Sequence, residues 1–135
     1  MEIKITNCAD ISYIMRNNAQ GQPFRYGDLA TDEDTGMYIR YQTYFAGTMT
    51  PEHTHPCAHA IYVLSGTLRT NGGDFGPGTC AWYPEGVSAF HGATPNEDLV
   101  CLFITNKPFD ITYKDPQFNL NHIKNLQELE KIKQK

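Results

Sequence analysis

The middle of the chain alternates between hydrophobic and polar positions. The clearest stretch runs from Met37 to Phe45, where odd- and even-numbered residues form two separate faces. A period of two is typical of a β-strand with one buried face. We expect the odd-numbered face to point inward, where its side chains either pack in the core or line a substrate pocket. The candidate pocket residues on this face are Tyr41, Thr43 and Phe45.

Further short hydrophobic runs follow, separated by segments rich in glycine, proline and asparagine. The segment LRTNGGDFGPG holds Asn-Gly and Gly-Gly pairs, which accommodate the positive φ angles of tight hairpins. Several short strands at this regular spacing are typical of β-sandwiches and barrels. The runs that we expect to form strands are Ile61–Leu64, Cys80–Tyr83, Val87–His91 and Leu99–Thr105.

Helical spacing occurs only near the C-terminus. Hydrophobic residues recur there every three positions, at Leu120, Ile123, Leu126 and Leu129. This pattern predicts an amphipathic helix that packs on the outside of the β domain or on a neighbouring subunit. A chain of 135 residues has the size of one domain. We divide it into an N-terminal arm with edge strands (1–36), a β-barrel (37–113) and a C-terminal helix (114–135).

The charge and the N-terminal residues narrow the possible partners. A formal net charge of −4 and a pI of about 5.6 argue against a broad positive surface, so we expect no nucleic-acid partner. We expect no membrane partner either, because there is no run of eighteen apolar residues. The first residues lack the pattern of a signal peptide, which predicts a cytoplasmic protein. The four cysteines form no CxxC pair, which favours reduced thiols.

Histidines are clustered in the chain. Four of the five, His53, His55, His59 and His91, lie within 39 residues. Residues two apart on a strand point the same way, so His53 and His55 can present their imidazoles side by side. His59 keeps this parity, although Pro56 interrupts strand pairing before it. Several buried imidazoles would have to stay neutral, and neutral imidazole suits zinc, copper, iron and nickel. The cluster therefore predicts a metal site.

The segments around these histidines resemble the two sequence motifs of the cupin superfamily. The first segment is GTMTPEHTHPCAHAIYVLSG (Gly47–Gly66), and the second is GTCAWYPEGVSAFHGATPN (Gly78–Asn96). Both motifs occur in the correct order, and together they span Gly47–Asn96. The resemblance implies an all-β fold, a single cupin-type double-stranded β-barrel (jelly roll), here followed by the C-terminal α-helix. It also implies one divalent metal bound inside the barrel.

The resemblance implies His53, His55, His59 and His91 as the metal ligands. His53 and His55 match the histidine pair of the first motif, and His59 stands where most cupins have glutamate. His91 lies two residues beyond the usual position of the second-motif histidine, which here is Ala89. Since two residues make one pleat, His91 keeps the inward face but needs a bulge to reach the metal.

Within the superfamily, the all-histidine ligand set and the segment HAIYVLSG are most similar to small metal-dependent dioxygenases. These enzymes cleave carbon–carbon bonds in β-diketones and hydroxyacetophenones. The similarity implies an oxidoreductase that acts on a small diketone or hydroxyketone with Fe(II), or otherwise with zinc, nickel or manganese. Two other functions stay open: a non-enzymatic small-molecule-binding or sensor cupin, and a non-redox metal-dependent isomerase or lyase.

Other reactive residues near the motifs are expected to have no part in the chemistry. Glu52 adjoins His53 and should point to the opposite face, and Glu85 lies in a turn. Cys57 is expected to be a small buried thiol, and His122 an ordinary surface or core histidine. Because no GxSxG or P-loop is present, we assign no catalytic residue apart from the metal ligands.

The run LVCLFI (Leu99–Ile104) is apolar at every position. A strand of this kind needs cover on both faces, which either the C-terminal helix or a second subunit can provide. Cupins that resemble this chain are commonly dimers. We therefore expect a homodimer whose partner besides the second copy is a small molecule.

Overall fold

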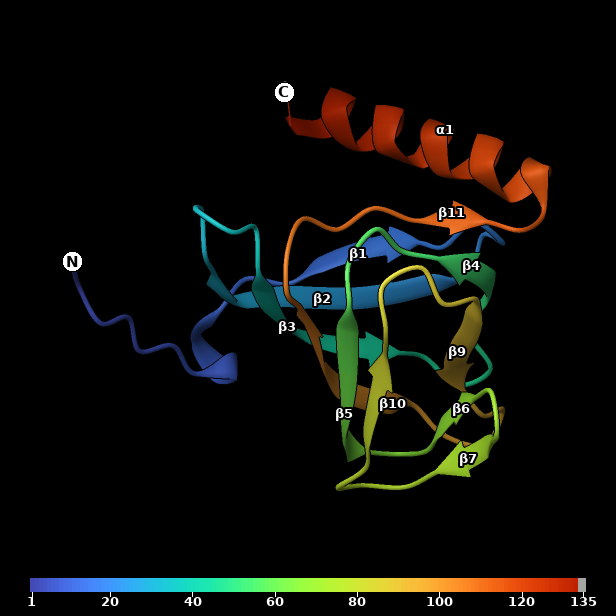
Figure 1. Cartoon of the computed structure of the whole chain (residues 1–135), viewed down its shortest axis with the longest axis horizontal. Helices are drawn as coiled ribbons and strands as arrows, with labels where there is room; N and C mark the ends of the chain where they lie inside the picture. The colour runs from blue at the N-terminus through green and yellow to red at the C-terminus, as the bar shows by residue number, and fades with distance from the viewer. Residues whose placement is uncertain (134–135) are drawn as a thin grey trace.

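The chain folds into two antiparallel β-sheets that face each other, with a long helix at the C-terminal end (Figure 1). The computed structural model describes residues 1–133. The six-stranded sheet consists, in spatial order, of β1 (Ile14–Asn17), β2 (Pro23–Thr31), β3 (Tyr38–Tyr44), β10 (Leu99–Thr105), β5 (His59–Ser65) and β8 (Cys80–Tyr83). The five-stranded sheet consists of β11 (Thr112–Tyr113), β4 (Met49–Thr54), β9 (Ala89–Ala93), β6 (Leu68–Thr70) and β7 (Gly73–Phe75).

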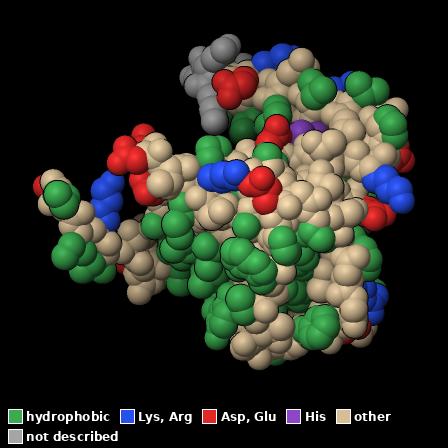
Figure 2. Space-filling model, viewed as in Figure 1, with side chains coloured by type: hydrophobic (Ala, Val, Ile, Leu, Met, Phe, Trp, Pro, Cys, Tyr) green, Lys and Arg blue, Asp and Glu red, His purple; other side chains and the backbone are tan. Residues whose placement is uncertain are grey.

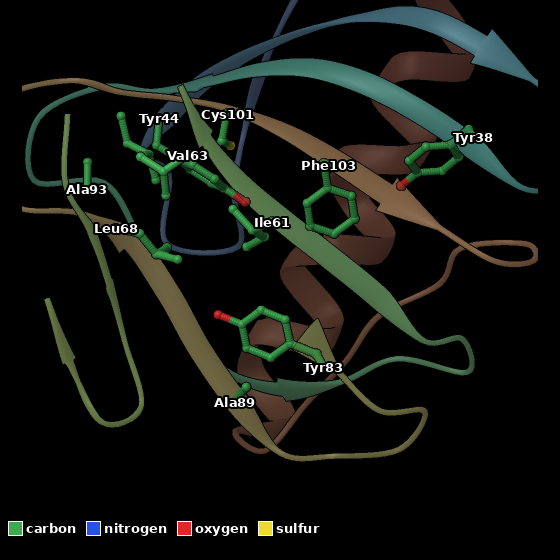
Figure 3. Close-up of a cluster of buried hydrophobic side chains, with 11 residues drawn as sticks. Tyr38, Tyr44, Ile61, Val63, Leu68, Tyr83, Ala89, Ala93, Cys101 and Phe103 are labelled. Atoms are coloured by element: carbon green, nitrogen blue, oxygen red, sulfur yellow. The ribbon is translucent and has the colours of Figure 1, made fainter. Parts of the chain in front are cut away.

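The main hydrophobic core fills the space between the two sheets. Strand β10 shows why: Leu99, Cys101 and Phe103 are buried on its inner face, as the period of two requires. Figure 3 shows the core side chains converging from β5, β9 and β10. The residues that form this core are Tyr38, Tyr44, Ile61, Val63, Leu68, Tyr83, Ala89, Ala93, Leu99, Cys101 and Phe103. This is the all-β, two-sheet fold that the sequence predicts.

Helix α1 (Pro116–Lys133) packs beside β11 and the turn between β1 and β2 (Figure 1). Asparagines hold it there: Asn119 exchanges two hydrogen bonds with the backbone of Tyr113, and Asn121 donates to the carbonyl of Ala19. No helix within residues 1–133 has the length and hydropathy needed to cross a bilayer.

The helix turns a different face inward from the one that the three-residue spacing predicts. Leu120, Ile123 and Leu126 are 54%, 51% and 40% exposed. Residues spaced three apart fall short of one full turn of 3.6 residues, so each lies further around the helix than the last. A row of such residues therefore turns away from the surface that contacts the sheet. The less exposed positions lie along one side of the helix and include Leu129 of the predicted repeat: Phe118, Asn119, Asn121, His122, Asn125 and Leu129.

Strand β4 contains a bulge that sets the position of the histidine-bearing segments. Thr50 pairs with His91 and His53 pairs with Ala89, so three steps along β4 match two along β9. The spacing of the second motif predicts a bulge that lets His91 reach the other histidines, and a bulge lies in the partner strand β4. Next to His91, a Cβ atom built on Gly92 would lie 2.1 Å from the carbonyl oxygen of Thr48. Glycine at this position therefore permits the close approach of β4 and β9.

We predict that Gly92→Ala destabilises the protein, because backbone atoms rather than a flexible side chain occupy the space for the new methyl group. Overpacking of this kind typically costs about 1–3 kcal/mol. Gly76→Ala is the matched control, since nothing lies within 4 Å of its Cβ position and its φ is not positive. The denaturant midpoints of the two variants test this. Equal midpoints at an unchanged m-value would contradict the close approach.

Candidate metal centre

Four histidines lie in the interior between the sheets. His53 belongs to β4, His55 follows its end, His59 begins β5, and His91 lies in the centre of β9. Their exposed fractions are 1%, 5%, 2% and 2%, so all four are shielded from solvent. The ring centroid of His53 lies 4.6 Å from that of His55 and 4.8 Å from that of His91. Two separate segments of the chain therefore bring their imidazoles to one place.

Three of the rings are held through their Nδ1 atoms. The Nδ1 of His53 lies 2.6 Å from the carbonyl oxygen of Pro51, and that of His55 lies 2.6 Å from the carbonyl oxygen of Asp110. The Nδ1 of His91 lies 3.3 Å from the hydroxyl of Tyr44. A carbonyl can only accept, so the neutral tautomers of His53 and His55 carry their proton on Nδ1. Their Nε2 atoms are left with a free lone pair.

The Nε2 atoms of His53, His55 and His91 are buried and have no hydrogen-bond partner within residues 1–133. The three residues offer ligand atoms that all lie within 4.8 Å of one another. Nitrogens bound to one tetrahedral zinc ion are about 3.4 Å apart. Small movements of the side chains would therefore bring the three nitrogens to this separation. Leaving three buried nitrogens without a partner is costly unless they meet a ligand. This group therefore fits a divalent metal.

His59 lies beside this group. Its ring centroid is 4.6 Å from that of His55 and 6.0 Å from that of His91. The ring is stacked between Tyr83 and Phe103, with centroid distances of 4.5 Å and 5.0 Å. Neither of its nitrogens has a hydrogen-bond partner among the described residues. The structure thus groups three of the four predicted ligands and stacks the fourth next to them.

The environment favours neutral imidazoles. Burial, followed by repulsion from His55, lowers the pKa of His53 to about 4, against a smaller opposite effect of the Pro51 carbonyl. Burial and then the neighbouring His55 and His53 lower the pKa of His59 to about 3. Burial likewise lowers the pKa of His55, and it lowers the pKa of His91 well below the usual value. At neutral pH all four rings are therefore in the form that binds metals.

A cavity of about 90 Å³ lies against His55 and His91. This is space for several water molecules or for a small ligand. Strand β3 contributes alternate residues to its wall, and these come from the even-numbered face. The residues of β3 that line the cavity are Tyr38, Arg40, Gln42 and Tyr44.

The structure corrects the predicted pocket wall, because Tyr41, Thr43 and Phe45 do not line this cavity. The ring of Tyr41 packs edge-on against Tyr13 on the other side of the sheet. Thr43 is buried on the same side as Tyr41, and Phe45 lies beyond the end of β3. Both faces of β3 carry aromatic residues. The alternation therefore predicted the strand correctly, but it could not predict which face points inward.

The cavity wall is aromatic and positively charged. Its positive charge comes from Arg16 and Arg40; His122 also lines it, but burial lowers the pKa of this imidazole, and none of the described residues in the wall is acidic. Arg40 is paired with Asp28 at 2.7 Å and lies between the rings of Tyr26 and Tyr38. Arg16 has no such carboxylate partner within residues 1–133. Its charge is therefore free to meet an anionic ligand.

The residues that were expected to stay out of the site do so with one exception. Glu52 is hydrogen-bonded to Ser88 at the surface, and Glu85 is paired with Lys107. Cys57 is a fully buried free thiol. His122, by contrast, reaches the cavity wall from α1, with its Nε2 3.8 Å from Asp110. The sequence alone could not show this, because only the packing of α1 brings His122 to the cavity.

Residues 7–110 match the family described as the ChrR cupin-like domain, which is most of the chain. The chain belongs to the ChrR cupin-like domain family. The matched region of this cupin contains all four clustered histidines and ends before α1. A comparison with curated proteins finds no match.

Solved structures show the same fold at low sequence identity. The polyketide cyclase RemF from Streptomyces resistomycificus is 20% identical, with a TM-score of 0.70 over 84% of this cupin and 87% of that chain. An RmlC-like cupin protein from Ralstonia eutropha is 13% identical, with a TM-score of 0.72 over 96% and 88%. The complex of Rhodobacter sphaeroides SigE with the anti-sigma ChrR contains a match with 22% identity and a TM-score of 0.59. There this cupin aligns over 73% of its own length and spans about half (51%) of that chain.

Loss of a residue that only hydrogen-bonds to a metal ligand typically weakens metal binding by roughly 10- to 100-fold. We predict that His53→Ala and His91→Ala each weaken metal binding by more than this. Each change removes one of the three unpaired Nε2 atoms. Metal content of tag-free protein and titration with Zn²⁺ measure the effect. His122→Ala is the control and should keep its metal, because His122 lies outside the three-histidine group. Equal metal retention in all three variants would contradict the assignment.

Proposed function

We propose that this cupin is a metal-dependent dioxygenase that cleaves a carbon–carbon bond in a small diketone or hydroxyketone. The observation that carries the proposal is the convergence of three buried, unpaired Nε2 atoms beside an aromatic, positively charged cavity. His53, His55 and His91 would bind the metal, and His59, whose ring centroid lies 4.6 Å from that of His55, would be the fourth ligand. Fe(II) is the metal that this reaction requires, whereas zinc, nickel or manganese would suit a reaction without electron transfer.

A divalent metal in this site would polarise the oxygens of a chelating substrate and, as Fe(II), would mediate the transfer of electrons from the bound substrate to dioxygen. The chain's own part is to keep the ligand set uncharged and oriented. The carbonyls of Pro51 and Asp110 fix the tautomers of His53 and His55. Because the four imidazoles add no negative charge, the positive charge of the site stays available for an anionic substrate.

The cavity favours an enolised, anionic substrate with a flat apolar body. The free guanidinium of Arg16 offers one charged contact away from the histidines, and Gln42 offers an amide. Phenylalanine and tyrosine side chains form a large part of the remaining wall, including Tyr38, Tyr44 and Phe103. Such walls bind rings and conjugated ketones by stacking and by excluding water.

A non-redox reaction on the same class of substrate is the second candidate. The specific observation that favours it is the uncharged, all-imidazole environment, which supports Lewis-acid chemistry with any of several metals. RemF, which has the same fold at 20% identity, is described as a polyketide cyclase. Ring closure of a polyketide also proceeds through enolised ketones, so the two candidates differ in the use of oxygen rather than in the type of substrate.

The oxidative proposal predicts oxygen consumption by the Fe(II)-loaded protein. Apoprotein is reconstituted anaerobically with Fe(II), mixed with acetylacetone or a hydroxyacetophenone, and then exposed to oxygen. We expect an absorption band on substrate addition, followed by uptake of one oxygen molecule per carbon–carbon bond cleaved. The zinc-loaded protein is the control and should bind without taking up oxygen. Turnover under strict anaerobiosis would instead support the non-redox candidate, and tight binding without turnover would support the sensor function.

Arg16→Gln should raise the KM for an anionic substrate by roughly tenfold. A charged hydrogen bond at a partly exposed site contributes about 1–2 kcal/mol to the binding free energy. The kcat should change much less, because Arg16 does not belong to the histidine group. Arg25→Gln is a matched control: Arg25 packs against Tyr13 and does not line the cavity. If both variants keep the wild-type KM for an ionised substrate, Arg16 does not recognise its charge.

A further inference from the structure

Helix α1 brings a fifth histidine to the cavity. His122 lines the cavity wall, and it lies beyond residue 110, where the match to the family ends. Its side chain is 20% exposed, whereas the four clustered histidines are buried. Figure 2 shows histidine surface at the junction of α1 with the two sheets. The ring of His122 is therefore accessible from the cavity and from water.

His122 lies beside the metal group without belonging to it. The ligand atoms that converge are those of His53, His55 and His91. Tyr113 packs edge-on against the ring of His122, with the centroids 6.2 Å apart, and its own centroid lies 6.0 Å from that of His53. The aromatic wall thus continues from the metal group to His122, whose lone pair is not needed for the metal.

Asp110 faces one nitrogen of the His122 ring. Its Oδ1 lies 3.8 Å from Nε2 of His122, which is long for a hydrogen bond but close enough for an ion pair once the ring is protonated. The same oxygen accepts a hydrogen bond of 2.8 Å from the backbone N–H of Ile111, which orients the carboxylate. A carboxylate at Nε2 favours the tautomer that carries its proton there. The lone pair of the neutral ring is then on Nδ1.

The surroundings of His122 keep it neutral at neutral pH. Burial lowers its pKa, the carboxylate of Asp110 raises it by a smaller amount, and the charge of Arg16 on β1 lowers it again, so that it lies below 6.5. Its neighbour on β11, Tyr113, is uncharged, because burial raises the pKa of that hydroxyl to about 12. A neutral imidazole beside a carboxylate can accept a proton, and the carboxylate then stabilises the imidazolium.

The other groups in the cavity wall are poorly suited to accept a proton. None of the described residues there is acidic. Tyrosine ordinarily loses its proton only near pH 10, and burial raises the pKa of Tyr44 and Tyr113 further. His55 and His91 belong to the metal group. Among the described residues of the wall, His122 is therefore the imidazole that is left to act as a base.

We propose that His122 is the general base that enolises the ketone substrate, with Asp110 as its positioning residue. This inference rests on the proposed function, because both the oxidative and the non-redox reaction begin from an enolised ketone. The Nδ1 of His122 forms a bond to a proton on the carbon next to the carbonyl. The C–H bond breaks, and its electron pair moves toward the carbonyl oxygen to give an enolate, which Arg16 can pair with. The imidazolium pairs with Asp110 and then releases its proton to water.

Deuterium exchange tests the proton transfer without oxygen. Zinc-loaded protein is mixed anaerobically with 2-hydroxyacetophenone in deuterium oxide, and NMR follows the loss of the methylene signal. The wild type should accelerate this exchange over a protein-free sample. His122→Gln should slow it by at least about 100-fold, because general bases typically contribute about 10²- to 10⁴-fold. The zinc content should stay unchanged.

Leu126→Ala is the matched control, since Leu126 is an exposed residue of the same helix, and it should exchange at the wild-type rate. No exchange by the wild type, or exchange by His122→Gln within twofold of the wild type, would overturn the proposal. Because oxygen is absent, this result is separate from the oxidative proposal. Oxygen uptake by the Fe(II)-loaded wild type can still succeed where the base assignment fails, and the reverse also holds.

An NMR titration of the His122 ring distinguishes a base from a merely structural residue. In the zinc-loaded wild type its pKa should lie below 6.5. Asp110→Asn should lower the pKa further, because the carboxylate stabilises the charged ring, whereas Arg16→Gln should raise it. The rate of deuterium exchange should fall as the pH drops through the His122 pKa, and this limb should move in the same direction in each variant. A limb that stays in place while the titration moves, or a titration that Asp110→Asn leaves unchanged, would contradict the assignment.

Discussion

The chemistry of the structure depends on three buried imidazoles that are fixed by their Nδ1 atoms between the two sheets. The carbonyls of Pro51 and Asp110 and the hydroxyl of Tyr44 occupy one nitrogen of each ring, and the other nitrogen has no partner. Burial prevents these rings from becoming protonated, since a charged imidazole would be poorly solvated there. A cation that binds at the free nitrogens is the natural way to satisfy them. The two sheets therefore hold three imidazole donors in positions that fit one divalent metal.

The fold serves this arrangement at several points. The bulge in β4 brings His53 opposite Ala89, and the close approach at Gly92 keeps β9 against β4. Strand β3 and helix α1 then build the cavity wall beside the histidines, with Arg16 and His122 from opposite ends of the chain. Of the three donors, His53 and His91 are strand residues and His55 directly follows β4, whereas Arg16 lies on the edge strand β1 and His122 on helix α1.

The fold and the histidine cluster could be read from the sequence because both depend on local periodicity and spacing. The motif segments lie within fifty residues of each other, and the structure buries all four of their histidines. The inward face of β3 could not be read, because Tyr38 and Tyr44 on one side are as apolar as Ile39 and Tyr41 on the other. The contacts of Arg16 and His122 depend on long-range packing, and the strict three-residue repeat gave the wrong face of α1. Local patterns therefore predicted the donors but not the wall around them.

An anomalous diffraction map of zinc-loaded crystals would show directly whether the three imidazoles bind one metal. We expect one strong peak between the two sheets, about 2.0–2.1 Å from the Nε2 atoms of His53, His55 and His91. A peak at the protein surface, a peak bound through Nδ1 atoms, or an empty interior after loading with excess zinc would contradict it.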